Sequence, residues 1–266
     1  MSRSSDGHPD HGLFGPDSVT WRLHADPTLI VGGLRALFLQ ALHPAVVIAT
    51  LEHSDFRADP WGRLVRTGEY VGTITYGTTV EARRAAARVK GMHRRVPGAG
   101  DPGLLLWVHC CEIESFLNTA RRAGLRLSSA DADRYVAEQT VAATLIGAPA
   151  GPSSADDLRE YFEGMRPALA VTTQAHEAAR YVLLPPMPRV VRLGTPARPA
   201  WAGLATLGFG LLPRWARRMY ALPGLPTTDL AATAAVAALR AGLLALPPAL
   251  RDGPNLKAAK ARLAAG

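Results

Sequence analysis

One stretch of the chain decides the fold, and it reads GGLRALFLQALHPAVVIATLEHSDF (residues 32–56), DPWGRLVRTGEYVGTITYGT (59–78) and VEARRAAARVKGMHRRVPG (80–98). Apolar segments alternate in it with polar side chains that a plain helical core excludes. These side chains are His43, Glu52, His53, Arg63, Thr67 and His93. We expect them to surround an apolar group that is charged at its rim.

Helical spacing of apolar residues predicts where His43 and His93 lie. Pro44 must kink, end or begin a helix, because proline lacks a backbone N–H and clashes with the preceding turn. His43 therefore sits at a helix boundary. From residue 80 the apolar positions follow a period of 3.6, which places His93 on the same face as Val89 and Val96.

Capping signals predict further helices along the rest of the chain. Asp101-Pro102 starts one that Gly124 ends, Ser128 with Asp131 starts another, and a third starts at Ser153 or Ser154. The segment VGTITYG is the best strand candidate, and prolines between residues 185 and 199 mark the main irregular connection. We expect an all-α protein with one helical domain over residues 21–250, a flexible N-terminus (1–20) and a flexible C-terminal tail (251–266).

Composition narrows the class of protein. A 48% hydrophobic content is enough for a large core, and the formal charge of +8 comes mostly from scattered arginines rather than from a basic stripe, so we do not expect nucleic-acid binding. Adjacent Cys110 and Cys111 predict buried fillers rather than a disulfide. The polar start of the chain lacks the features of a signal peptide, and Arg240 interrupts the longest apolar run. We expect a cytoplasmic protein, with peripheral membrane contact left open.

Several familiar catalytic motifs are missing from the sequence. It has no GxGxxG after a strand, no P-loop, GxSxG, HExxH or CxxC pattern, and no Glu-x-x-His pair for a di-iron site. The sequence therefore lacks the motifs that usually indicate a nucleotide-dependent enzyme or a zinc protease.

His93 is the strongest candidate for function. A haem needs an axial imidazole, an apolar wall and cations for its propionates. His93 offers the imidazole, Arg94 and Arg95 follow it, and Arg63 with Thr67 share one face of an upstream turn. The alternative is a core histidine with satisfied hydrogen bonds.

Three further residues carry two interpretations each. His109 is either a core histidine bonded to Glu112 or a second axial ligand, which would favour electron transfer. Glu52 is either a solvated helix end or a general base whose pKa an apolar pocket raises. His43 is equally open to both a structural and a cofactor-binding role.

The order of these motifs resembles a known family. GGLRALFLQALHPAV, EHSDFRADPWGRLVRT, TYGT, VKGMHRRVPG, DPGLLLWVHC and LLPRWARRMYAL are similar to segments of the family that includes the fungal MpaB oxygenase, the latex clearing protein and the rubber oxygenase catalytic domain. The similarity spans about residues 28–222.

The resemblance implies an all-helical fold that holds haem b on an axial histidine. Arg63 and Thr67 match the family's R-x-x-x-T pair, Arg66 stands where latex clearing proteins carry a lysine, and His93 matches the haem ligand. Glu52 is the nearest counterpart of the catalytic glutamate.

Characterised relatives cleave carbon–carbon double bonds with dioxygen in polyisoprene or a prenyl chain. The resemblance therefore implies a haem oxygenase for an apolar, isoprenoid-type small molecule. The alternatives are a bis-histidine haem redox or sensor protein, and a metal-free helical module for a lipid or metabolite. The sequence predicts no oligomeric state.

Overall fold

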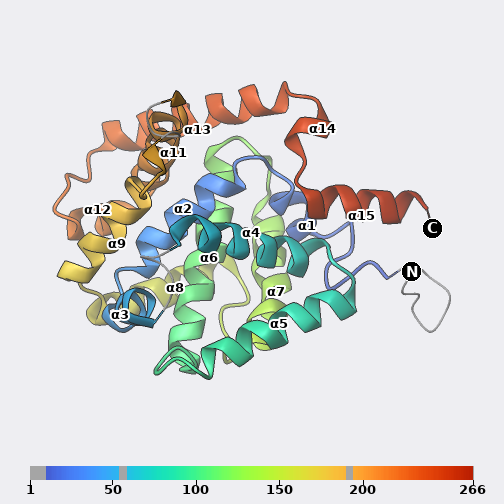
Figure 1. The fold of residues 1–266 in the computed structure, drawn as a ribbon, viewed down its shortest axis with the longest axis horizontal. Coiled ribbons are helices and arrows are strands. Elements are labelled where there is room, and N and C mark those ends of the chain that lie inside the picture. Colours follow the sequence, from blue (N-terminus) through green and yellow to red (C-terminus); the bar gives the residue numbers. More distant parts are fainter. Residues whose placement is uncertain (1–9, 54–58, 190–193, 266) are drawn as a thin grey trace.

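The computed structural model describes residues 10–53, 59–189 and 194–265. All regular structure in these ranges is helical, which confirms the predicted all-α class. The helices, drawn in Figure 1, are α1 (Val19–His24), α2 (Leu29–Gln40), α3 (Pro44–His53), α4 (Pro60–Tyr76), α5 (Thr79–His93), α6 (Pro102–Arg122), α7 (Ser129–Ile146), α8 (Ala155–Met165), the short 3₁₀ helix η1 (Arg166–Ala168), α9 (Thr173–Leu183), α11 (Ala197–Gly210), α12 (Arg214–Met219), α13 (Pro226–Leu244), α14 (Pro248–Arg251) and α15 (Pro254–Ala264).

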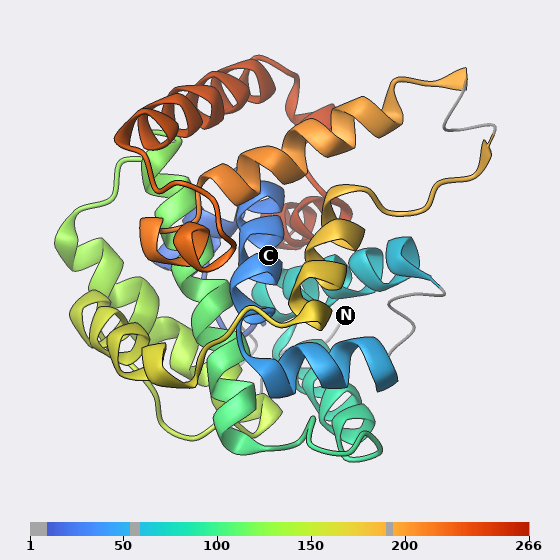
Figure 2. The ribbon, with the colours of Figure 1, turned by 90° about the vertical axis from the view of Figure 1, so that its left-hand side faces the viewer.

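Helices α2 and α6 form the centre of the fold, with the other helices around them (Figure 2). Their contact is close because Gly32 has no side chain. A Cβ atom there would lie 2.9 Å from Cδ1 of Phe116. Phe38, Leu39 and Trp107 are fully buried beside this contact, and both cysteines lie in the same core as free thiols. Burial of this apolar area is the main force that holds the fold.

The predicted helix boundaries are confirmed where a specific residue caps or breaks the backbone. Pro44 begins a second helix, so His43 lies at the α2–α3 junction. The Asp101 carboxylate accepts a 2.9 Å bond from the backbone N–H of Leu104 at the start of α6. Ser128 and Ser154 cap α7 and α8, and Gly124 adopts a φ of +92° just after α6. That φ favours glycine, which has no Cβ to clash.

The strand expected at VGTITYG is wrong, because the segment forms the last turns of α4. Its β-branched and aromatic residues favour a strand in isolation. In the helix, however, Ile74 and Tyr76 are buried, Ile74 against α5 and Tyr76 against Trp21 and the buried side chains of α15. Tertiary packing therefore outweighs local propensity here.

The expected flexible tail also needs correction, since residues 254–264 form α15. Leu256 and Ala259 are buried against Trp21 and Tyr76, and Arg262 donates a 2.7 Å hydrogen bond to the Tyr76 carbonyl. Contacts with residues far along the chain therefore dock this short segment on α4.

The described part of the N-terminus is likewise packed. Phe14 is buried, and Asp10 accepts a 2.9 Å bond from the backbone N–H of Thr79. Residues 1–9 and 54–58, and the side chain of His53, lie outside the description.

Within the described ranges, no single helix has both the length and the hydropathy to cross a bilayer. Helices α2 and α3 have the required length and hydropathy only when they are counted as one segment, and their axes are bent by 107° relative to each other.

Candidate functional site

Helices α4 and α5 form an antiparallel pair that is tight at one end and loose at the other. At the tight end, Thr78 caps α5, and Ala82 and Ala86 pack with Ile74. In Figure 1 the two helices diverge away from this turn. Residues 63–67 of α4 and 89–93 of α5 are half-buried or exposed, and we call these two segments the open end of the pair.

His93 lies at the open end, on the last turn of α5. Its Nδ1 atom is buried and has no hydrogen-bond partner among the described residues. Burial lowers the pKa of His93, and the positive charge of Arg63 on α4 lowers it further. The ring is therefore neutral at pH 7, which is the form that binds metals.

The other predicted α4 residues are more exposed. Thr67 donates a 2.9 Å hydrogen bond to the Arg63 carbonyl, so its hydroxyl already serves the helix backbone. Arg66 pairs with Asp59 at 3.1 Å, and Asp59 also caps α4 through the Gly62 N–H. Arg63 is the α4 residue whose charge acts on His93.

His43 lies close to the same end of the fold. Its Nδ1 atom is buried without a partner among the described residues, and burial lowers its pKa against the opposing charge of Asp101. A Cβ atom on Gly100 would lie 3.9 Å from the His93 carbonyl oxygen. The connection between α5 and α6 thus brings both histidines into one neighbourhood.

Glu52 and His109 have other surroundings. Glu52 is exposed near the end of α3, next to residues that the structure does not describe. His109 is buried and bonded to the Gln139 backbone, and burial lowers its pKa to about 4. It faces α7, whereas His93 packs beside α4.

Glu112 is a candidate that the sequence analysis left out of the site. Burial raises its pKa to about 7, and its charge acts on Tyr70 of α4 and Tyr135 of α7. The signal in the sequence is an acidic residue inside the apolar run LLLWVHCCEIESFL. A carboxyl group with this pKa can both accept and release a proton near neutral pH.

A buried hydrogen-bond chain continues from Tyr135. The Thr75 hydroxyl donates to the Val71 carbonyl, so His24 Nδ1 is the donor in its 2.7 Å bond to Thr75. The other ring nitrogen of His24 then accepts from the Tyr135 hydroxyl at 3.1 Å. Glu112 thus lies beside polar groups whose hydrogen bonds have a defined direction.

Large apolar side chains on α3, α4 and α5 remain exposed. Val65 of α4 is 57% exposed and Met92 of α5 is 52% exposed, and Ile48 of α3 is exposed as well. Exposed apolar side chains near an unpartnered imidazole fit the chemistry of a haem, which needs an apolar wall and one histidine.

The described ranges hold no group of three or more His, Cys, Asp or Glu side chains that could bind a metal ion. A family model described as "ER-bound oxygenase mpaB/B'/Rubber oxygenase, catalytic domain" matches residues 21–256. This match covers every candidate residue named above. No curated protein and no solved structure matches the chain.

Proposed function

The chain belongs to the family of ER-bound oxygenase mpaB/B' and rubber oxygenase catalytic domains, and from that premise we propose a haem b-dependent oxygenase that acts on an apolar, isoprenoid-type small molecule. Family membership identifies an oxygenase-type catalytic domain. The haem, the substrate class and the residue roles are the content of the proposal.

The surroundings of His93 carry the proposal. Axial ligation needs a neutral imidazole with a nitrogen that the protein has not engaged. Burial and Arg63 keep the His93 ring neutral, and its buried Nδ1 has no partner among the described residues. The exposed side chains of Val65 and Met92 offer apolar surface on the same two helices.

In this proposal His93 holds the iron, and the guanidinium groups of Arg63 and Arg66 bind the propionates. Thr67 keeps Arg63 in place through its bond to the Arg63 carbonyl. His43 borders the pocket at the α2–α3 junction.

A bound haem would supply dioxygen chemistry, while the protein supplies shape, polarity and proton positions. In the cleavage we propose, one C=C bond and the O=O bond break and two C=O bonds form, so no external reductant is consumed. Glu112, with a pKa near 7, is the carboxyl group best suited to hold or release a proton. In this proposal Glu52 also assists proton movement, because the resemblance makes it the nearest counterpart of the family's catalytic glutamate.

Two other functions have less support. A bis-histidine redox or sensor protein needs His109 at the iron, but His109 is buried against α7, whereas His93 lies at the open end of the α4–α5 pair. A metal-free lipid or metabolite carrier would use the exposed apolar side chains but has no need for an unpartnered, neutral His93. An isoprenoid substrate partitions into membranes, so peripheral membrane contact belongs to the proposal.

Haem reconstitution followed by a product assay tests the proposal. We expect the wild-type protein to bind haem one to one with a Soret band, and to convert squalene and dioxygen into carbonyl products that a hydrazine reagent traps. His93→Ala should lose the band and the products with its helical circular dichroism retained, whereas His109→Ala should keep both. A wild-type protein that stays colourless with excess haem would overturn the haem assignment. An intact Soret band without carbonyl products would overturn the substrate class alone.

A further inference from the structure

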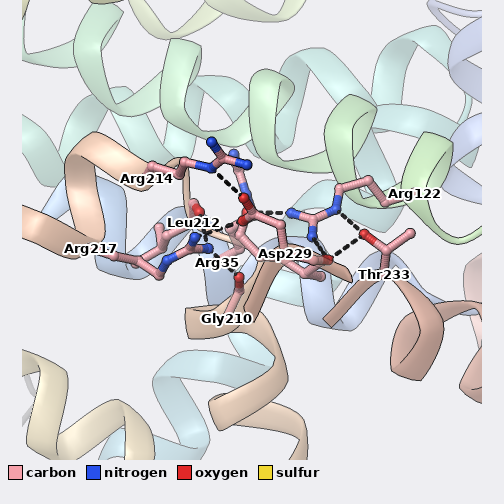
Figure 3. A network of polar contacts seen from close by, with 9 residues as sticks. Arg35, Arg122, Gly210, Leu212, Arg214, Arg217, Asp229 and Thr233 are labelled. Atoms are coloured by element: carbon pink, nitrogen blue, oxygen red, sulfur yellow. Dashed lines mark hydrogen bonds and ion pairs between the residues drawn. The ribbon is translucent and has the colours of Figure 1, made fainter. Parts of the chain in front are cut away.

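A cleft lies at the C-terminal end of α6, away from His93. Its volume is about 300 Å³, and it is bordered by α2, the last turns of α6, the α11–α12 connection and α13. Figure 3 shows the polar side chains in and around it, which include four arginines. These are Arg35, Arg122, Arg214 and Arg217.

Two of the four arginines are fully buried and bonded to carboxylates. Arg35 forms a bidentate pair with Glu114 and donates a 2.9 Å bond to the Leu211 carbonyl. Arg217 donates a 2.6 Å bond to Asp229. These pairs fix the walls of the cleft.

Arg122 differs from them because none of its hydrogen-bond partners is a carboxylate. It donates to the Thr233 hydroxyl at 2.8 Å, to the Leu211 carbonyl at 3.2 Å and to the Asp229 backbone carbonyl at 2.7 Å. Burial is the main cause that lowers the pKa of Arg122. The charges of Arg35 and Arg217 lower this pKa further, whereas the carboxylates of Asp229 and Glu114 raise it. The Arg122 guanidinium is therefore a half-buried cation that has no carboxylate among its hydrogen-bond partners.

The whole cluster carries excess positive charge. Its four guanidinium groups share two carboxylates, Glu114 and Asp229, which leaves two positive charges. Arg214 is half-exposed and pairs with Asp229 through Nε, so its terminal nitrogens remain available to a ligand. Asn118 also lines the cleft, and its buried Oδ1 has no hydrogen-bond partner among the described residues.

We propose that this cleft binds a phosphate group, either free or as the monoester of a small metabolite. A phosphate dianion matches the two uncompensated charges, and guanidinium groups bind its oxygens in a planar, bidentate geometry. Arg122 and Arg214 make these contacts. A cleft of this size also has room for a small group attached to the phosphate.

Thermal unfolding in matched salts tests this site. Sodium phosphate is titrated against sodium chloride at equal ionic strength, and glycerol 3-phosphate forms a second arm. We expect phosphate to raise the Tm of the wild type saturably, beyond the effect of chloride. A larger shift with glycerol 3-phosphate indicates a monoester site, and an equal shift indicates a site for free phosphate.

Arg122→Gln should abolish the saturable shift. Arg121→Gln is the matched control, because it removes the same charge from the neighbouring exposed position, whose hydrogen bond goes to the Ser128 carbonyl. If Arg122→Gln fails to fold, Arg214→Gln at the exposed mouth of the cleft should weaken the apparent affinity for phosphate at least fivefold. A wild-type shift no larger than that of chloride, or an equal response in the cleft variant and in Arg121→Gln, would overturn the proposal.

Discussion

Arg35 in the α2–α6 core and His93 at the open end of the α4–α5 pair differ in how their polar atoms are bonded. In the core, Arg35 is 1% exposed, and its guanidinium bonds to a carboxylate, a hydroxyl and a backbone carbonyl. At the open end, His93 has a buried nitrogen with no partner among the described residues, and large apolar side chains stay exposed.

The two residues contrast a buried polar side chain that is fully bonded with one whose buried nitrogen has no partner in the described part of the chain. A buried polar group without a partner costs free energy, so proteins satisfy such groups unless another role requires them free. Arg35 is satisfied and belongs to the architecture. His93 is not, and it stands where the family expectation places a cofactor.

The largest change should follow from breaking the core pair. Arg35→Met leaves Glu114 without its cation, and removal of one partner of a buried ion pair typically costs about 3–5 kcal/mol. Urea denaturation should show a loss of this size in the free energy of unfolding. Arg35→Met combined with Glu114→Gln should recover part of the loss, since no unpaired charge then remains. A single variant as stable as the wild type would show that the core does not depend on this pair.

The second-largest expected change in the free energy of unfolding comes from Glu112, and its size depends on pH. Burial raises its pKa from an ordinary 4.5 to about 7, so between these pH values the folded state binds more protons than the unfolded state. Stability therefore falls as pH rises through this window. Glu112→Gln removes that cost and should stabilise the haem-free protein by about 3 kcal/mol more at pH 8.5 than at pH 4.5. A gain that is the same at both pH values would mean that Glu112 ionises as an exposed glutamate does.

The smallest expected changes in the free energy of unfolding come from a glycine-to-alanine substitution made once in the α2–α6 core and once beside the open end. Gly32→Ala forces a Cβ against Phe116 in the core and should cost about 1–2 kcal/mol. Gly68→Ala, on α4 beside the open end, meets nothing within 4 Å and should stabilise the protein by about 0.5–1 kcal/mol, because alanine favours the helix. Chemical denaturation of the two variants measures the opposite signs. Equal effects would show that the two regions are packed alike.

The sequence predicted the parts of the fold that depend on local chemistry. Asp101, Ser128 and Ser154 cap helices as expected, since a capping side chain needs only its own backbone neighbours. VGTITYG was mispredicted because its helical state depends on partners outside the segment, in the following helix α5 and in the distant α15. The docking of α15 was missed for the same reason.

The site was predictable only in part. Helical period placed His93 on a partly buried face, and the upstream Arg63 was named from the same stretch of sequence; its charge acts on His93. Glu112 escaped because a raised pKa results from burial by α4 and α7, which one helix cannot reveal. The arginine cleft unites residues from four separate helical segments, and no local pattern in the sequence connects them.

Chemical rescue of the proposed iron ligand tests the central claim most directly. His93→Gly removes the imidazole and leaves room for a free one, so the variant should bind haem without a normal Soret band. Millimolar imidazole should restore the band in His93→Gly and leave His109→Gly, which keeps His93, unchanged. A normal Soret band in His93→Gly without imidazole would contradict the assignment of His93 as the axial ligand.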